Sequence, residues 1–376
     1  MFSVFPKASF AGILGGLPPW VQNNDTTKYQ IISKGGEAGE YQAFPDACKL
    51  KNGDILAVFY GGYGHVSYPN EGYPNAGRIC MVRSKDEGKT WSKPITIFDD
   101  IYDNRDPHIS QLNDGTIMVS FFSLNLKSNP KSRTGVGVQF IQSFDNGYSW
   151  TERPRQVSIT GTDWYCSAPI REMSNGTLVF PVYKQVLGSE HAWGGVFLSY
   201  DKGKSWTDPI AIGEEAELFL AAETDVVRLN DGTLLAALRG QKELPMHYSI
   251  SNDVGKSWSE VQSIGFLAHS PHFNRLTTGE ILMTYRGVEG SETFDWDKAY
   301  TALRISYDEG KSWQGPFKMD ESRGAYPATV ELSDGNILLI FYEEGENSGV
   351  GALKFEMPDK SYHLAPVAQP INILEN

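Results

Sequence analysis

Side chains that can exchange protons stand just ahead of several apolar segments of the chain. Asp106 and His108 occur in the run NRDPHIS, Glu223 and Asp225 in AETDVV, and Tyr326 in AYPATV. A tyrosine hydroxyl is a weak nucleophile until a nearby carboxylate takes its proton, and a second carboxyl group can serve as a general acid. These residue types indicate acid–base chemistry, provided that the fold brings segments so far apart in the chain to one place.

An octet that recurs five times gives the first indication of that fold. Its copies are SKDEGKTW from Ser84, SFDNGYSW from Ser143, SYDKGKSW from Ser199, SNDVGKSW from Ser251 and SYDEGKSW from Ser306. We expect a hairpin turn in which Asp accepts backbone N–H groups, Gly supplies a positive φ and Trp anchors the loop. A repeat of roughly 55 residues is typical of a β-propeller. Because the octet recurs around the periphery, we interpret it as structural and not as a sugar or calcium site.

A second repeat occurs six times. It consists of an apolar strand, a polar-Gly turn and another strand. Its turn glycines are Gly53, Gly115, Gly176, Gly232, Gly279 and Gly335. With the strands on either side of the octet, such as 94–98, each unit forms one four-stranded antiparallel blade, so the chain is predicted to be an all-β, six-bladed β-propeller. The last unit lacks an octet and a fourth strand, and we expect the strand at 28–34 to complete it. Residues 1–26 are then an N-terminal extension, and residues 27–376 form a single propeller domain.

Aligning the six glycines gives a common frame for the residues at the mouth of the propeller. Nine residues before each glycine stand Phe44, Asp106, Ser167, Glu223, Ser270 and Tyr326. Seven residues before stand Asp46, His108, Pro169, Asp225, His272 and Ala328, with Trp164 and Tyr165 nearby in the chain. Two Asp and two His could bind a metal. No tight ligand spacing supports one, so we expect these groups to bind sugar hydroxyls or one another, without a metal or other cofactor.

Composition excludes several classes of partner. The formal net charge of −13 opposes binding to nucleic acid. No run approaches the roughly 18 apolar residues of a membrane span, so no membrane association is expected. The three cysteines suggest neither a disulfide framework nor a zinc ribbon. The first twenty residues are a poor secretory signal, so we expect a cytoplasmic protein if Met1 is the native start and a secreted one if a signal was removed. The oligomeric state is not readable from the sequence.

From about Tyr41 to Glu356 the octets and the six units resemble the sialidase (neuraminidase) superfamily. The resemblance implies that Glu223 and Tyr326 form the nucleophile pair of those enzymes. It also implies that Arg239 grips a substrate carboxylate, with Arg286 as a second arginine. Arginine suits this task because its planar fork of donors matches a carboxylate.

The chain departs from the superfamily pattern in its first blade. Ala43-Phe44-Pro45 stands where sialidases carry Arg-Ile-Pro, so the first arginine of their triad is absent. The aspartic acid expected in the following loop is also absent, and that loop offers His65 instead. Arg105 could replace the arginine, and Asp106, Asp46 or His65 could replace the acid.

Three functions remain open. The first is a sialidase-like, exo-acting glycoside hydrolase on an oligosaccharide or glycoconjugate that is acidic, with Glu223 and Tyr326 opposite the acid. The second is a polysaccharide lyase on uronate sugars, in which His65, His108, His272 and Tyr326 would move protons and Arg105 or Arg239 would neutralise the carboxylate. The third is a glycan-binding propeller without catalysis. The ionisable groups gathered at unique positions favour the hydrolase over simple binding.

Overall fold

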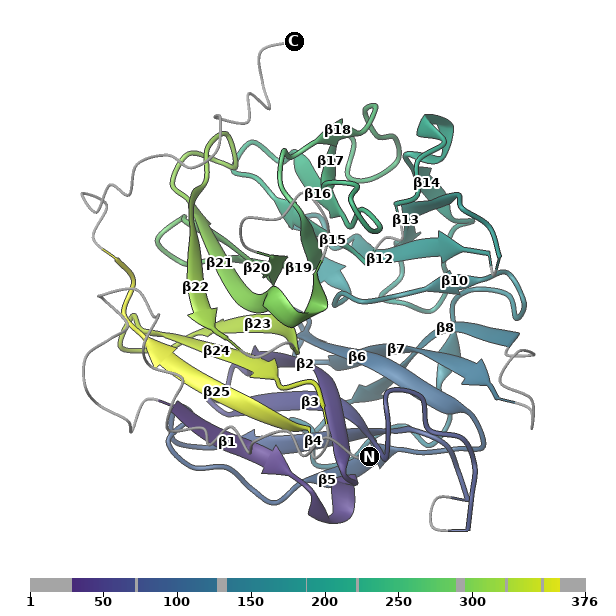
Figure 1. Cartoon of the computed structure of the whole chain (residues 1–376), viewed down its shortest axis with the longest axis vertical. Helices are drawn as coiled ribbons and strands as arrows, with labels where there is room; N and C mark the ends of the chain where they lie inside the picture. The colour runs from purple at the N-terminus through teal and green to yellow at the C-terminus, as the bar shows by residue number, and fades with distance from the viewer. Residues whose placement is uncertain are drawn as a thin grey trace, which may run out of the picture.

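Six antiparallel sheets are arranged as a ring around a central axis (Figure 1). The structure is a computed structural model that describes residues 29–358, except 72–73, 127–133, 187, 221–222, 289–294, 322–323 and 346–347. Each sheet holds four strands in sequence order except the third, which has a fifth short strand, and the last, which is completed from the N-terminal side. The predicted six-bladed propeller is confirmed. None of the helices in the described ranges is long and apolar enough to cross a membrane.

The first three blades follow one another from Tyr41 to Ile212. Blade one consists of β2 (Tyr41–Lys49), β3 (Ile55–Gly62), β4 (Arg78–Ser84) and β5 (Ile95–Phe98). Blade two consists of β6 (Asp103–Gln111), β7 (Ile117–Asn125), β8 (Thr134–Ser143) and β9 (Arg155–Gln156). Blade three consists of β10 (Trp164–Tyr165), β11 (Arg171–Glu172), β12 (Leu178–Gln185), β13 (Ala192–Ser199) and β14 (Ile210–Ile212).

The other three blades close the ring. Blade four consists of β15 (Thr224–Arg228), β16 (Leu234–Leu238), β17 (His247–Ser251) and β18 (Gln262–Ser263). Blade five consists of β19 (Ala268–Arg275), β20 (Ile281–Val288), β21 (Ala299–Ser306) and β22 (Gln314–Asp320). Blade six consists of β23 (Ala325–Glu331), β24 (Ile337–Tyr342), β25 (Gly349–Phe355) and β1 (Tyr29–Lys34). The described residues also include three short 3-10 helices: η3 (Gly36–Ala38), η5 (Glu214–Ala216) and η6 (Trp296–Lys298).

The sixth blade is completed by the strand that precedes the first blade. β1 pairs antiparallel with β25, with Tyr29 opposite Leu353 and Lys34 opposite Gly349. The two strands lie side by side in Figure 1, purple against yellow. The prediction that the N-terminal strand closes the ring is therefore confirmed. Pairing the two ends in one sheet leaves no open gap between the first and last blades.

Apolar side chains hold neighbouring blades together. The second strand of each blade is buried on both faces, as in β3, where every residue is buried. One cluster joins Leu56 and Val58 of β3 to Val119 and Phe121 of β7 in the next blade. Full burial of such a side chain is worth about 1.5–3 kcal/mol. Because these contacts recur around the ring, the inner ends of the blades form a rigid frame for the residues on the axis.

The octets form the outer turns that the sequence predicts. In the first octet the hydroxyl of Ser84 accepts the N–H of Gly88 at 2.9 Å, and Asp86 accepts the N–H of Thr90 at 2.8 Å. Gly88 has φ +79° and the indole of Trp91 donates to its carbonyl at 3.1 Å. The turn is thus satisfied by its own residues, which fits the structural interpretation of the repeat.

A β-bulge near the start of the innermost strand recurs in blades one, two, five and six. The residue nine before the turn glycine lies in it with a left-handed backbone: φ is 54° at Phe44, 47° at Asp106, 54° at Ser270 and 43° at Tyr326. Left-handed backbone costs a non-glycine residue of order 1–3 kcal/mol and persists only where the surroundings enforce it. Bulges of this kind re-aim a side chain, and here they occur at the strand ends that meet around the axis.

Candidate active site

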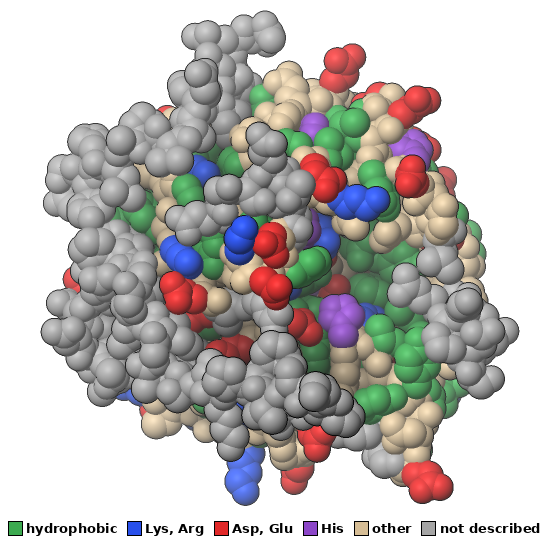
Figure 2. Space-filling view, viewed as in Figure 1, with side chains coloured by type: hydrophobic (Ala, Val, Ile, Leu, Met, Phe, Trp, Pro, Cys, Tyr) green, Lys and Arg blue, Asp and Glu red, His purple; other side chains and the backbone are tan. Residues whose placement is uncertain are grey.

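Two adjoining pockets form one groove where the innermost strands begin. The first, of about 430 Å³, is lined by Asp106, Glu223 and Tyr326 from blades two, four and six, with Arg105 and Tyr165. The second is lined by Arg286, Trp296, Tyr342 and Glu344. His65, Arg239 and Tyr326 belong to both, so we call the two together the central groove. Figure 2 shows acidic and basic side chains lying beside one another near the middle of one face.

Glu223 and Tyr326 meet at the centre of this groove. The Tyr326 hydroxyl donates to Oε1 of Glu223, and Arg239 Nη1 lies 2.5 Å from the same oxygen. The backbone N–H of Ser270 donates to the other oxygen, Oε2, at 3.0 Å. The carboxylate thus has donors on both oxygens although it is only 4% exposed, and its tyrosine partner arrives from 103 residues further along the chain.

The electrostatics of the pair favour a charged Glu223 and a neutral Tyr326. Burial acts to raise the pKa of Glu223, but Arg239, the hydrogen bond from Tyr326 and Arg286 together hold that pKa below its usual range. Burial and the Glu223 charge raise the pKa of Tyr326 well above 10, more than the nearby arginines lower it. Glu223 is therefore a charged acceptor beside a protonated hydroxyl, which is the state a base and its nucleophile need before reaction.

Arg239 and Arg286 flank the tyrosine. Arg286 donates through Nε to the carbonyl of Gly324 at 2.6 Å, and its guanidinium lies 5.1 Å from the ring centre of Tyr326 and 4.8 Å from that of Trp296. Both arginines line the groove. They place two permanent positive charges beside the Glu223–Tyr326 pair.

Arg105 lines the groove but is engaged with its own neighbours. Its Nη1 donates to Asp103 at 3.0 Å and to the backbone carbonyl of His65 at 2.5 Å. Its guanidinium lies 5.3 Å from the ring centre of Phe44, the residue in the first-blade motif that lacks an arginine. Phe44 in turn packs against Tyr326 at 4.9 Å between ring centres. The ring of Phe44 therefore covers one side of the Tyr326 ring.

Asp106 has a free carboxyl oxygen at the groove. Ser167 donates to its Oδ2 at 3.1 Å, whereas Oδ1 is buried and makes no hydrogen bond with any residue that the structure describes. Burial raises the pKa of Asp106, Arg105 opposes the rise and the charge of Glu223 adds to it. A carboxyl group whose pKa is raised and which has one uncommitted oxygen can act as a general acid.

His65 lies at the edge of the groove with more than half of its side chain exposed. Its Nδ1 is 3.0 Å from the Tyr41 hydroxyl and 3.9 Å from Oε2 of Glu344. Tyr41 and Tyr342 each donate to that carboxylate at 2.8 Å. This network orients the imidazole, which makes His65 a second candidate for the acid.

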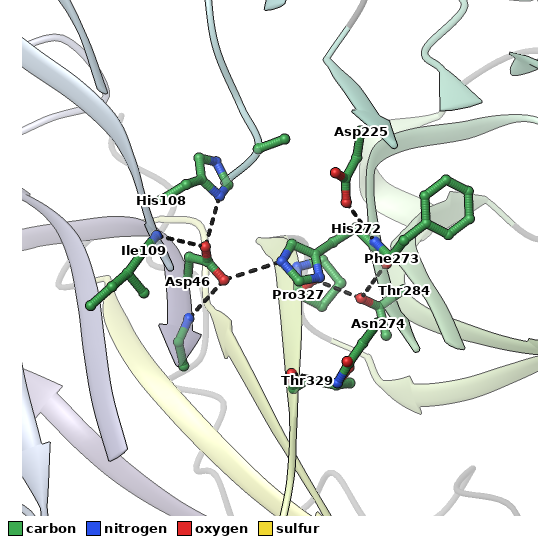
Figure 3. A network of polar contacts seen from close by, with 12 residues as sticks. Asp46, His108, Ile109, Asp225, His272, Phe273, Asn274, Thr284, Pro327 and Thr329 are labelled. Carbon is green, nitrogen blue, oxygen red and sulfur yellow. Dashed lines mark hydrogen bonds and ion pairs between the residues drawn. The ribbon is translucent and has the colours of Figure 1, made fainter. Parts of the chain in front are cut away.

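Four residues that the sequence places at the mouth are buried instead: Asp46, His108, His272 and Asp225. None of them is among the described residues that line the central groove. They lie seven residues before the turn glycines, two residues further along the chain than the mouth positions, and Figure 3 shows them together near the axis. Asp46, one of the acids proposed from the sequence, is 0% exposed. It accepts the backbone N–H groups of Ala47 at 2.7 Å and Ile109 at 2.9 Å. In blade one a bulge separates the two positions, and the backbone of the next blade binds the Asp46 carboxylate.

The two aromatic residues predicted near the mouth also differ in place. Tyr165 lines the groove and its hydroxyl lies 3.4 Å from Asp163. Trp164 is 7% exposed and packs on Phe197, with ring centres 5.9 Å apart. Only Tyr165 can contact a ligand in the groove.

Several groove residues were not singled out from the sequence. One signal could have found three of them, Phe122, Tyr183 and Tyr342, because the residues seven after each turn glycine are Tyr60, Phe122, Tyr183, Arg239, Arg286 and Tyr342. All of these except Tyr60 line the groove. Trp296 and Glu344 lie outside the common frame, in connections that differ between blades, and no repeat predicts them.

Comparison with known proteins agrees with this architecture. The pattern of the BNR repeat-like domain family matches residues 78–339. A sialidase of Bacteroides fragilis is 21% identical over 314 residues, which are 78% of this chain and 45% of that protein. A sialidase of Vibrio cholerae is 24% identical over 230 residues, 53% of this chain and 27% of that protein. The chain thus spans less than half of these relatives.

Solved structures share the fold at low identity. A Dyadobacter fermentans protein of unknown function superposes with a TM-score of 0.71 at 22% identity, covering 88% of this chain and 98% of that one. The NanB sialidase of Streptococcus pneumoniae superposes with a TM-score of 0.66 at 14% identity, covering 88% and 71%. At this identity the likeness establishes the fold alone. The chain belongs to the BNR repeat-like domain family, and its propeller shares the fold of the sialidase structure on which it superposes.

Proposed function

We propose that this protein is a glycoside hydrolase that acts from the end of an acidic oligosaccharide, with Tyr326 as nucleophile and Glu223 as its base. The observation that carries the proposal is the hydrogen bond from the Tyr326 hydroxyl to Glu223 inside a groove that also holds Arg239 and Arg286. Named relatives support it, since the matched proteins of Bacteroides fragilis and Vibrio cholerae are sialidases.

The reaction follows from the charges of the groups. Glu223 takes the proton of Tyr326 as the phenolic oxygen attacks the anomeric carbon, and the bond to the leaving oxygen breaks as Asp106 gives it a proton. Water then attacks the glycosyl-tyrosine, Asp106 takes a proton from that water, and the proton on Glu223 returns to the phenolic oxygen. Two displacements at one carbon retain its configuration. Because the tyrosine is neutral, the carboxylate of the sugar does not repel it as it would repel a phenolate.

The arginines support an anionic sugar. Arg239 and Arg286 can offer donors to a carboxylate, and such charge-assisted bonds are about twice as strong as neutral ones. Ala43 stands where a third arginine would be expected, so the carboxylate is held from fewer sides, and the ring of the neighbouring Phe44 offers an apolar contact. We therefore expect a substrate range that differs from that of enzymes with three arginines.

A product assay on sialylated, uronate-containing and neutral oligosaccharides tests the proposal. Release of a reducing sugar without a new ultraviolet band supports hydrolysis, whereas an unsaturated, ultraviolet-absorbing product indicates a lyase. Tyr326→Phe and Glu223→Gln should each lower turnover at least about a hundredfold, the scale of general acid–base catalysis. Tyr200→Phe and Glu215→Gln, at exposed positions away from the groove, are matched controls. Glycan binding without turnover on the whole panel would contradict the proposal in favour of a binding propeller.

A further inference from the structure

Asp46, His108 and His272 form a cluster on the axis that the proposed reaction does not use. Oδ2 of Asp46 lies 3.2 Å from Nδ1 of His108, and its Oδ1 lies 3.1 Å from Nε2 of His272 (Figure 3). One potential ligand atom from each residue lies within 4.8 Å of the other two. The three residues come from β2, β6 and β19, so the ring closure of the propeller brings them together.

Asp225 supplies a comparison within the same molecule, because it occupies the equivalent position in blade four. Each aspartate accepts the N–H of the residue after it and one N–H of the next blade: Val226 and Phe273 for Asp225, both at 2.7 Å. An aspartate at this position can therefore bind the backbone of the next blade without a histidine. Asp225 completes its environment with a cation, since Arg171 donates to its two oxygens at 3.2 and 2.5 Å.

Asp46 has two imidazoles where Asp225 has a guanidinium. A buried carboxylate is costly unless a positive charge accompanies it, and no lysine or arginine forms an ion pair with Asp46 among the described residues. His108 and His272 are 4% and 7% exposed. Nε2 of His108 and both ring nitrogens of His272 make no hydrogen bond in the described structure, and Nε2 of His272 is near Asp46 but poorly aligned for one.

We propose that Asp46, His108 and His272 bind one divalent transition-metal ion, with Zn²⁺ as the first candidate. Two neutral imidazoles and a carboxylate are a ligand set of zinc and related ions, whereas Ca²⁺ and Mg²⁺ prefer oxygen ligands throughout. The ion supplies the positive charge that Arg171 supplies to Asp225. The backbone N–H groups of Ala47 and Ile109 orient the carboxylate, as hydrogen bonds behind a metal ligand commonly do.

The geometry requires the two imidazoles to move closer to each other. Tetrahedral ligands at about 2.0–2.2 Å from a Zn²⁺ ion lie about 3.3–3.6 Å apart, whereas the three ligand atoms here lie within 4.8 Å of one another, with Asp46 already 3.2 and 3.1 Å from the two imidazoles. A rotation of the His272 ring, which no hydrogen bond fixes, can close this difference. His108 donates to Asp46 through Nδ1, and moving that proton to the free Nε2 leaves Nδ1 available to the ion. Asp46 and His272 also line a pocket of about 300 Å³ that shares no described lining residue with the central groove, so the ion has its own route of entry.

Metal titration of the full chain tests this site. After treatment with a chelator and dialysis, calorimetry with Zn²⁺ should give one equivalent per chain, and Zn²⁺ should raise the melting temperature. Co²⁺ should give visible absorption bands typical of nitrogen and oxygen ligands. His272→Gln and His108→Gln should each weaken binding at least about tenfold, because even removal of an outer partner of a metal ligand costs ten- to a hundredfold.

His191→Gln is the matched control, because His191 is a partly buried histidine outside the cluster. Absence of saturable Zn²⁺ binding by the unaltered chain would overturn the proposal and leave a protonated histidine as the partner of Asp46. Binding that survives both His272→Gln and His108→Gln would also overturn it, since the ion would then lie elsewhere. The Co²⁺ spectrum of the unaltered chain decides the case if either variant fails to fold. No outcome depends on hydrolysis, so this test is separate from that of the proposed function.

Discussion

Two layers of inward-facing side chains lie only two residues apart on the innermost strands, and they differ in how their polar groups are satisfied. In the mouth layer, nine residues before the turn glycines, Asp106 keeps an oxygen without a hydrogen bond to any described residue, and Glu223 binds Tyr326 and Arg239 of the groove besides one N–H of the next blade. In the staple layer, seven residues before, Asp46 and Asp225 bind the backbone of the next blade. The same strand thus supplies a reactive position and a structural one. Mutations in the two layers should therefore separate activity from stability.

The largest effect is expected in the staple layer, from Asp225→Ala. The substitution leaves Arg171 without its carboxylate and the N–H of Phe273 without its acceptor. Breaking a buried ion pair costs about 3–5 kcal/mol, and we expect about 3 kcal/mol because Arg171 is partly exposed. Urea unfolding measures the loss, while activity of the folded fraction at low temperature should stay near normal. A stability change below about 1 kcal/mol would contradict the assignment of stability to the staple layer and of activity to the mouth layer.

A similar effect on rate, with little on stability, is expected in the mouth layer from Asp106→Asn. If Asp106 gives its proton to the leaving oxygen, turnover on a natural linkage falls at least about a hundredfold. An activated aryl glycoside, whose leaving group needs no proton, should be affected much less. Comparing the two substrates in both proteins measures the difference.

The pH dependence identifies the acid. Burial raises the pKa of Asp106, so its protonated, active form is lost, and the rate falls, as the pH rises through that raised value. Asp106→Asn should remove this alkaline limb of the pH–rate profile and His65→Gln should leave it in place. The opposite result would assign the proton to His65.

A smaller effect is expected from Arg286→Met, which removes one of the two arginines beside Tyr326. A hydrogen bond to a charged group is worth about 1.5–3 kcal/mol, so kcat/KM for an acidic substrate should fall about thirtyfold at 2 kcal/mol. A neutral substrate should lose much less. Arg275→Met, which removes an arginine paired with Glu309 away from the groove, is the control. Equal losses on acidic and neutral substrates would contradict the role of Arg286 in carboxylate binding.

The sequence predicts the fold and the mouth layer, but it does not distinguish the staple layer from the mouth. Turn glycines and octets recur, so counting them gives six blades and places Glu223 and Tyr326 on strands that meet at the axis. A bulge has no such signature, because it depends on how a strand pairs with its neighbour. For this reason Asp46 could not be distinguished from the residues of the mouth. Glu344 and Trp296 could not be predicted either, since they lie in connections that obey no repeat.

Residues with left-handed backbone occur both at the mouth and in the outer octets, so the two regions can be compared at this one feature. Val254 has φ 63° in the fourth octet, at the position where the second octet has Asn146 with φ 60°. Asparagine tolerates this conformation better than a β-branched residue. Val254→Asn should therefore stabilise the protein by about 0.5–1 kcal/mol, at the low end because Val254 also packs on its blade.

Asn146→Val is the reverse control and should destabilise the protein by a similar amount. Thermal unfolding measures both, and turnover should be unchanged in both. At Tyr326 the same backbone conformation occurs in the proposed nucleophile, and Tyr326→Gly should remove activity because it removes the hydroxyl, whatever it does for stability. Loss of turnover in Val254→Asn would mean that the outer turns also position the groove.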